Sequence, residues 1–332
     1  MLMTRTILTR CRLHHAAMMA AALMLWLSPT AQTQSSKVED ARQPASFDAA
    51  HAPVGSSVRF LVFGDWGTGG RTQRKVAEGM AAVFAKAGAD AVLSTGDNFY
   101  PSGVASIEDS QWKSKFEDMY PASTLPVPFH TVLGNHDYQG NPDAQIRYSR
   151  RKLDNGTVTR WRMPARMWSE RFASTDGTVS TRVIGIDTQI ITGRDNDARS
   201  AHLRWLDSAL AAARESWIIV VGHHPVYSNG SHGNTLGLIR HVKPLLEKHK
   251  VAVYLSGHDH DLQVLEPVEG VHYIVSGGGG GSRSVRWAAN TRYAATNLGF
   301  TWLAAGTKEL VVRMHDAEGE VRWAFSIPAA GR

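Results

Sequence analysis

Polar residues that can bind metal ions occur in five short motifs along this 332-residue chain, each after an apolar run. The motifs are Gly64-Asp65-Trp66-Gly67, Gly96-Asp97-Asn98-Phe99-Tyr100, Gly134-Asn135-His136-Asp137, Gly222-His223-His224-Pro225 and Gly257-His258-Asp259-His260. Their carboxylates, imidazoles, amide and phenol offer oxygen and nitrogen ligands. Because rigid strands hold the loops that follow them in fixed positions, such ligands can converge at one end of a sheet. The five motifs in this order predict a two-metal site that hydrolyses phosphate esters.

Asp97 is the candidate for a carboxylate that binds both ions. A shared carboxylate brings two cations to ~3.5–4 Å, which is the spacing of two-metal hydrolases. The only cysteine, Cys11, lies close to the N-terminus in a segment that resembles a secretion signal. Disulfides and thiolate zinc sites are therefore excluded from the expected mature chain.

The order and composition of the motifs resemble the calcineurin-like metallophosphoesterases, and most closely the small purple acid phosphatases of the tartrate-resistant type. The resemblance extends from about Val58 to Val275 and includes Gly185-Ile186-Asp187-Thr188 between the motifs. It implies that metal site one consists of Asp65, Asp97, Tyr100 and His260. It implies that metal site two consists of Asp97, Asn135, His223 and His258.

Tyr100 distinguishes this chain from most of the superfamily. Most members carry a histidine two residues after the first aspartate, where this chain has Gly67. The phenolate of Tyr100, three residues after Asp97, would replace that ligand and favour a hard trivalent cation. Fe(III) is therefore expected at site one, with a purple colour from iron–tyrosinate charge transfer. Site two suits Fe(II), Zn(II) or Mn(II), and the sequence does not choose among them.

The same resemblance implies the catalytic groups. A metal-bound hydroxide would attack the phosphorus in line, with the charge on the phosphoryl oxygens neutralised by the cations and by His136. His136 and His232 match the family's outer-sphere histidines, and Asp137 is expected to orient His136. Imidazolium, with an unperturbed pKa of ~6.5, binds phosphate and donates a proton best on the acid side, so an acid optimum is expected. His224 is either a substrate contact or a neighbour of the site.

The leading functional hypothesis is an acid phosphatase of broad specificity for small phosphate monoesters. A phosphodiesterase or nucleotide pyrophosphatase of the same superfamily is the first alternative. The second is a redox-active di-iron protein that generates reactive oxygen species. Nucleic-acid binding is not expected, because no recognition module is visible in the sequence.

Alternating strands and helices, followed by a β-rich tail, predict an α/β protein. The family resemblance implies a four-layer αββα sandwich with two mixed β-sheets flanked by helices. Strands are expected over residues 58–63, 89–94, 127–133, 182–186, 217–221, 251–255 and 273–275, and a meander from residue 299. Helices are expected over residues 71–87, 198–214 and 235–248. Residues 138–180 are polar with turn signals. The glycine run 277–281 is either a loop near the site or a flexible connector.

The N-terminus predicts secretion. Residues 1–31 resemble a signal peptide, with three arginines before an apolar run of roughly 12 residues, shorter than the ~20 that span a bilayer. Residues 32–56 read as a flexible leader and residues 57–328 as the catalytic domain. We expect a monomer that is secreted or periplasmic and free of the membrane after cleavage. The formal net charge of +6 suits an anionic substrate.

Overall fold

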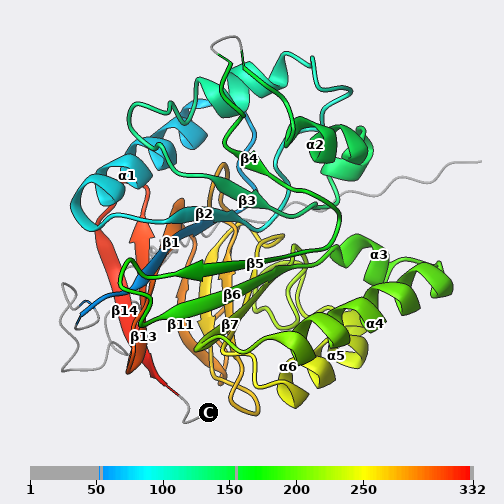
Figure 1. The fold of residues 1–332 in the computed structure, drawn as a ribbon, viewed down its shortest axis with the longest axis vertical. Coiled ribbons are helices and arrows are strands. Elements are labelled where there is room, and N and C mark those ends of the chain that lie inside the picture. The colour runs from blue at the N-terminus through cyan, green and yellow to red at the C-terminus, as the bar shows by residue number, and fades with distance from the viewer. Residues whose placement is uncertain (1–51, 53–54, 154–155, 330–332) are drawn as a thin grey trace, which may run out of the picture. The chain divides into compact units, whose positions relative to one another are not determined.

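Two mixed β-sheets pack face to face in the computed structural model, which describes residues 52, 55–153 and 156–329 (Figure 1). The strands are β1 (Val58–Phe63), β2 (Ala91–Ser94), β3 (Phe129–Thr131), β4 (Trp161–Arg162), β5 (Trp168–Ala173), β6 (Ser180–Gly185), β7 (Trp217–Val221), β8 (Val253–Ser256), β9 (Leu262–Leu265), β10 (His272–Ser276), β11 (Thr291–Ala295), β12 (Gly299–Ala305), β13 (Glu309–Asp316) and β14 (Val321–Pro328). The helices are α1 (Arg71–Ala87), α2 (Pro142–Tyr148), α3 (Thr188–Thr192), α4 (Asn196–Ala212), α5 (Leu236–His241) and α6 (Lys243–Lys248). A short π-helix (Trp112–Glu117) and a 3₁₀ turn (Asp137–Gln139) complete the elements.

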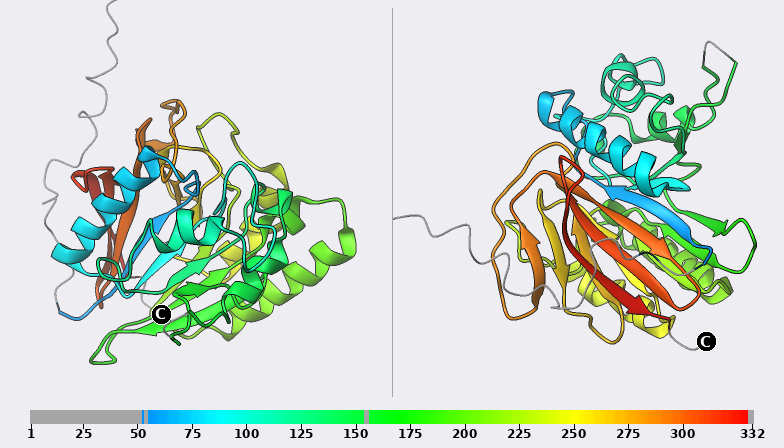
Figure 2. Two further views of the ribbon diagram at one scale, coloured as in Figure 1. Left: turned by 90° about the horizontal axis from the view of Figure 1, so that it is seen from above. Right: turned by 90° about the vertical axis from the view of Figure 1, so that its left-hand side faces the viewer.

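The first sheet has the strand order β14-β13-β12-β1-β2-β3-β4. Strands β1 to β4 are parallel, whereas β12 pairs antiparallel with β1, and β13 and β14 continue as the predicted meander. Figure 2 shows these C-terminal strands, in orange and red, beside β1 in blue. The first and last parts of the domain therefore share one sheet.

The second sheet has the order β11-β9-β10-β8-β7-β6-β5. Strands β6, β7, β8 and β10 are parallel, and β5, β9 and β11 add antiparallel edges. Helices α3 to α6 lie along the outer face of this sheet, while α1 and α2 lie on the side of the first sheet (Figure 1). This arrangement confirms the predicted class of two mixed sheets flanked by helices.

Strand β7 shows why the layers form. All five of its residues are buried, and they alternate between two cores. Trp217, Ile219 and Val221 belong to the core that includes the space between the sheets. Ile218 and Val220 belong to the core beneath the helices. A strand covered on both faces reads as a continuous apolar run, because successive side chains point to opposite faces.

The bounds of β1, α1 and β7 agree with the prediction residue for residue. Residues 138–180, for which the sequence indicated only polar character and turns, also contain α2, β4 and β5. The helix expected over 235–248 is two helices that meet at Val242. Pro244 lacks the amide proton that would continue the first helix, so the chain turns there.

The predicted signal over residues 1–31 and nearly all of the predicted leader over 32–56 fall outside the described residues. Among the residues that are described, no helix is both long enough and apolar enough to cross a bilayer.

Candidate metal centre

The five motifs lie where parallel strands end. Asp65 follows β1, Asp97 follows β2, and Asn135 follows β3, all in the first sheet. His223 follows β7, and His258 and His260 follow β8, in the second sheet. Hydrogen bonds from His223 to Thr95 and from His258 to Asp65 join these loops across the two sheets. The centre therefore forms only where both sheets present the carboxyl ends of their parallel strands together.

Three of these residues adopt a backbone conformation that side chains usually avoid. Asp65, Asp97 and His258 have φ values of 58°, 50° and 68°. Only two other non-glycine residues in the described part of the chain, Lys250 and Glu269, have positive φ. Such strain costs on the order of 1–3 kcal/mol per residue and concentrates at functional sites. The loops therefore hold these side chains at a cost in backbone energy.

Glycines in the motifs allow the loops to approach closely. A Cβ atom on Gly134 would lie 2.2 Å from Asp97 Oδ1 and 2.4 Å from the Asp97 amide nitrogen. A Cβ on Gly257 would lie 2.3 Å from Asp65 Oδ2. Any side chain at either position would displace a carboxylate of the centre. The repeated glycine before each polar residue is thus a packing requirement of the site.

The first cluster forms around the Tyr100 hydroxyl. This oxygen lies 2.8 Å from Asp97 Oδ2, 3.1 Å from Asp65 Oδ1 and 3.1 Å from His260 Nε2. One hydroxyl has one proton, so it cannot donate to all three neighbours at once. His260 Nε2 also lies 3.6 Å from Asp65 Oδ1. The four residues implied for site one thus place more hydrogen-bond acceptor atoms close together than the Tyr100 proton can satisfy.

The second cluster forms around His223 Nε2. This nitrogen lies 3.0 Å from Asn135 Oδ1, 3.2 Å from His258 Nδ1 and 3.5 Å from Asp97 Oδ1. His223 Nδ1 lies 3.0 Å from the Thr95 carbonyl oxygen, which can only accept, so Nδ1 carries the proton. The Nε2 lone pair therefore faces the cluster, as metal ligation requires.

Asp97 belongs to both clusters through different oxygens. Its Oδ2 faces the Tyr100 hydroxyl and its Oδ1 faces His223. Ligand atoms of Asp65, Asp97 and His223 all lie within 4.8 Å of one another, and all three residues are buried. The structure thus brings all seven predicted ligands together, with Asp97 shared as a bridging carboxylate would be.

The electrostatics of the centre call for a cation. Burial, reinforced by the charge of Asp97, raises the pKa of Asp65 well above its usual range. Burial, reinforced by Asp65 and Asp97, raises the pKa of Tyr100 as well. Burial lowers the pKa of His223 and His258, which favours the neutral imidazole in both. Two adjacent carboxylates with neutral imidazoles and a phenol fit a pair of metal ions, which would hold the acids ionised.

His136 flanks the first cluster. Its Nδ1 lies 2.6 Å from the Pro101 carbonyl oxygen, so that nitrogen donates and Nε2 faces the centre, 4.0 Å from Asp97 Oδ2. The ring lies 4.4 Å from the Tyr100 ring, measured between centroids. Its side chain is 28% exposed, which leaves it accessible to a substrate.

Asp137 does not orient His136, contrary to the sequence-based expectation. Its carboxylate is fully buried and accepts hydrogen bonds from Asn98, Gly134 and Gln145 at 2.8–3.1 Å. The described contacts of the His136 ring are instead with Pro101, Tyr100 and Asp97. Burial, followed by the charge of Asp97, raises the pKa of Asp137 to about 7. Asp137 ties the loop of Asp97 to the loop of Asn135.

His232 flanks the second cluster. Its ring lies 4.1 Å from that of His258, and its backbone amide donates to Asp259 Oδ1 at 2.8 Å. A residue that the sequence analysis missed, Arg283, reaches His232, with 2.6 Å between its Nη1 and His232 Nε2. Arg283 lies on an exposed loop without periodicity, and its only sequence signal is the glycine run that precedes it.

His224 also lies beside the centre, with its ring 4.5 Å from that of His258. Its Nδ1 lies 2.8 Å from the Thr188 hydroxyl. Burial, followed by the neighbouring histidines His223 and His232, lowers the pKa of His224 to about 3. His224 is therefore a neutral neighbour of the second cluster.

The glycine run 277–281 is a tightly packed wall of the centre, not a loose connector. A Cβ on Gly277 would lie 2.1 Å from the Asp259 carbonyl oxygen and 2.8 Å from Asp65 Oδ2. A Cβ on Gly280 would lie 2.5 Å from the Trp66 carbonyl oxygen. The backbone of this run therefore lies against the first motif.

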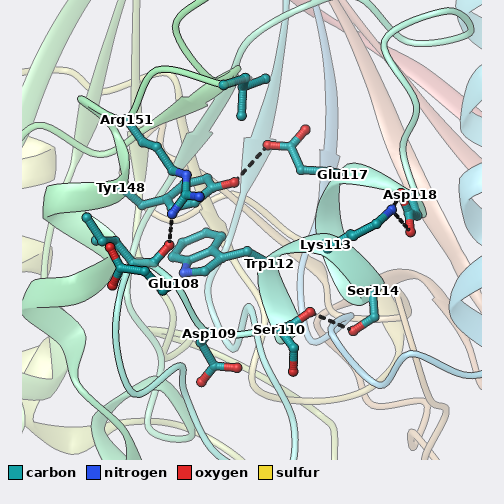
Figure 3. A pocket seen from close by; sticks show the side chains of 12 residues that line it. Glu108, Asp109, Ser110, Trp112, Lys113, Ser114, Glu117, Asp118, Tyr148 and Arg151 are labelled. Atoms are coloured by element: carbon teal, nitrogen blue, oxygen red, sulfur yellow. Dashed lines mark hydrogen bonds and ion pairs between the residues drawn. The ribbon is translucent and has the colours of Figure 1, made fainter. Parts of the chain in front are cut away.

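A separate hollow of about 660 Å³ lies between the π-helix and α2, lined by residues such as Trp112, Lys113, Tyr148 and Arg151 (Figure 3). It includes none of the predicted ligands. Trp112 stacks on Tyr148 at 3.6 Å and meets the ring of Phe99 at 4.8 Å. This wall braces Phe99, the residue that precedes Tyr100.

Comparison with known proteins supports these observations. Residues 58–262 match the calcineurin-like phosphoesterase family. Tartrate-resistant acid phosphatase type 5 of Oryctolagus cuniculus is 35% identical over 302 residues, covering 82% of this chain and 91% of that protein. Purple acid phosphatase 3 of Arabidopsis thaliana is 34% identical over 278 residues, covering 80% and 76%. The solved structure of GAP50, described as the anchor in the inner membrane complex of Plasmodium, aligns with a TM-score of 0.77 and 26% identity over 84% of this chain and 90% of that chain.

Proposed function

Because the chain belongs to the calcineurin-like phosphoesterase family, we propose that it is a binuclear-metal acid phosphatase that hydrolyses small phosphate monoesters. The observation that carries this proposal is the pair of ligand clusters that share Asp97. The relatives named above as acid phosphatases are hydrolases, whereas GAP50 is described as an anchor. Fold alone does not decide between such roles, so the proposal rests on the side chains of the site.

We assign Asp65, Asp97, Tyr100 and His260 to site one and Asp97, Asn135, His223 and His258 to site two. The phenol and two carboxylates of site one suit Fe(III), and the two imidazoles and amide oxygen of site two suit Fe(II), Zn(II) or Mn(II). When bound, two such ions supply Lewis-acid polarisation of the phosphoryl group and activation of water.

The two flanking histidines supply the remaining chemistry. His136 lies beside the first cluster and His232 beside the second, so a phosphate over the two clusters has one imidazole on each side. Protonated His136 would stabilise charge on the phosphoryl oxygens. Protonated His232 would donate a proton to the leaving oxygen. Both roles need imidazolium, which is why we propose an acid optimum.

Residues 57–328 form the catalytic domain in this proposal, and residues 1–31 direct secretion or export to the periplasm. The partners are small phosphate esters, and the active form is a monomer. Cell fractionation, N-terminal sequencing of the mature protein and its mass in solution test these statements directly.

The central test compares two substrates on the purified, metal-loaded protein. We expect faster hydrolysis of 4-nitrophenyl phosphate than of bis(4-nitrophenyl) phosphate, with about two metal ions per chain. Faster hydrolysis of the diester would support a phosphodiesterase instead. Peroxidase turnover that exceeds phosphatase turnover would support the redox di-iron alternative.

His232→Ala tests the proton donor. General acid catalysis is worth ~10²–10⁴-fold, and alkyl phosphates need it more than nitrophenyl phosphate, so the loss should be larger for alkyl substrates. Both metals should remain bound. His241→Ala, on α5, is the matched histidine control and should leave both rates unchanged. Equal losses on both substrate types would make His232 a binding residue, and loss of metal would make it a ligand.

A further inference from the structure

Arg283 places an exposed cation beside the candidate metal centre. Its backbone amide donates to the carbonyl oxygen of His260, a predicted site-one ligand, at 2.7 Å. Its guanidinium reaches His232, the proposed proton donor beside site two, at 2.6 Å. The close-packed glycine run ends two residues earlier, at Gly281. The backbone of Arg283 is therefore tied to the loop of His260, while its guanidinium lies against the ring of His232.

The side-chain partner of the Arg283 guanidinium is an imidazole. Within the described part of the chain, Arg283 forms no ion pair with a carboxylate. Other arginines do, for example Arg182 with Glu215 and Arg322 with Asp316. The positive charge is nevertheless close to the centre, because the guanidinium contacts His232, whose ring lies 4.1 Å from the ring of His258. An unpaired guanidinium at this place is available to an anion.

The present partner of Arg283 is a weak one. A guanidinium has five donors and no acceptor, so His232 Nε2 must accept the bond. A carboxylate or a phosphate accepts two parallel, charge-assisted bonds from a guanidinium, which is a stronger arrangement than one bond to neutral imidazole. An anionic group within reach would therefore draw Arg283 away from His232.

We propose that Arg283 binds an anionic group on the leaving portion of the substrate, so that the site favours phosphate monoesters whose alcohol carries a carboxylate or a second phosphate. This inference rests on the proposed function, because it takes His232 as the group beside the leaving oxygen. Because the Arg283 guanidinium lies within hydrogen-bond distance of His232, it would also lie next to that leaving group.

The proposal links substrate recognition to catalysis. While Arg283 donates to Nε2, His232 cannot donate a proton from that nitrogen. An anionic leaving group that takes Arg283 frees the Nε2 lone pair to bind a proton from water, which Nε2 can then pass to the leaving oxygen. With a substrate that lacks the second anion, Arg283 continues to compete with the leaving oxygen for His232 Nε2. Arg283 thereby acts on specificity through kcat/KM for one class of leaving group.

The test uses two substrates with matched primary alkoxide leaving groups. 3-Phosphoglycerate carries a carboxylate where glycerol 3-phosphate carries a neutral hydroxymethyl group. We expect Arg283→Gln to lower the ratio of their kcat/KM values about tenfold, as for loss of one charge-assisted bond at an exposed site. The wild-type preference should also weaken as salt is raised, because exposed charges are screened. Arg283→Lys should keep part of the preference, since it retains the charge but not the paired donors.

Arg286→Gln is the matched control, because Arg286 is a second exposed arginine on the same loop, anchored by its backbone amide to the Asn229 carbonyl oxygen at 3.1 Å. It should leave the ratio unchanged. An equal loss on both substrates in Arg283→Gln would overturn the proposal, because Arg283 would then act on the transferred phosphoryl group or only position His232. An unchanged ratio would overturn it too. A wild-type protein that hydrolyses neither ester would refute the proposed function, and this inference with it.

Discussion

Asp137→Asn distinguishes two roles for a buried carboxylate next to His136, the proposed catalytic histidine. Asp137 either orients the His136 ring or ties together the loops that carry Asp97 and Asn135. In the structure its Oδ2 accepts from the Gly134 amide at 2.9 Å and from Asn98 Nδ2 at 3.1 Å. Its Oδ1 accepts from Gln145 Nε2 at 2.8 Å, and the Asn98 amide reaches both oxygens. Every neighbour of the carboxylate is a donor. An asparagine would turn one of its two oxygens into an additional donor.

The magnitude follows from this count. Whichever way the new amide points, it meets at least two donors and leaves buried hydrogen-bonding groups unsatisfied. One such group costs ~1–3 kcal/mol, and the charge assistance of the remaining bonds is lost as well. Rotation of the Gln145 amide does not repair the defect, because Gln145 Oε1 already accepts from Asn98 Nδ2 at 3.2 Å. We therefore expect Asp137→Asn to destabilise the domain by about 3 kcal/mol, or roughly 6 °C in Tm.

The assay is thermal unfolding of the metal-free protein at about pH 8.5, above the Asp137 pKa of about 7, so that the carboxylate is ionised. Metal content and turnover of the loaded protein follow. His136→Gln is the control, because its half-exposed ring should affect turnover with little change in Tm. Asp137→Asn should lower both Tm and metal affinity, because the native carboxylate ties together the loops that carry Asp97 and Asn135. If Asp137→Asn instead keeps its Tm and its metals and loses turnover as His136→Gln does, then orientation of His136 is its role and the structural reasoning is wrong.

Three further outcomes are expected. Asp97→Ala should remove both metal ions together with activity, because each cluster uses one of its oxygens; near-normal turnover with two ions bound would exclude a bridging role. Tyr100→Phe should abolish the visible absorption of the loaded protein while sparing part of the phosphatase activity, and an unchanged spectrum would show that the phenol is not a ligand. His130 lies in an aromatic environment of Trp168 and Phe172, where burial and then the charge of Arg162 lower its pKa to about 4 from 6.5. Between those two pH values the unfolded chain binds a proton that the folded chain does not, so stability should fall as pH falls, by up to ~3 kcal/mol from this group. His130→Phe should reduce the difference in the free energy of unfolding between pH 7 and pH 4, measured by denaturant titration. An unchanged difference would show that His130 does not cause it.

The parts of the fold that sequence reasoning predicted are those whose burial is periodic. The apolar run Trp217–Val221 and the amphipathic helix Arg71–Ala87 were predicted with the correct bounds. Strand β5 was missed because it is an edge strand, and most of its residues are exposed or half-buried. Helix α2 was missed because it spans only seven residues and begins with a proline. Short or edge elements depend on tertiary contacts that leave no periodic signal.

For the site, the motifs predicted which residues lie close together, but they did not predict which side chains contact one another. The seven ligand candidates came from residue type and order, and the structure brings them together in two clusters. Asp137 was expected to orient His136, but the 3₁₀ turn begins at Asp137 and its carboxylate is buried. Arg283 was missed because an exposed loop places it beside His232 from 51 positions away.

The pairing of β1 with β12 has a consequence for synthesis of the chain. The family match ends at residue 262, and every predicted metal ligand has been synthesised by residue 260. The strand that positions Asp65 nevertheless gains its antiparallel neighbour only when residues 299–305 emerge. Until then the nascent chain exposes one edge of a strand that is apolar at every position except Arg59, which is the type of surface that recruits other strands and aggregates. Chains cut between residues 262 and 299 would hold every proposed ligand and still expose this edge, so premature termination there should yield insoluble protein.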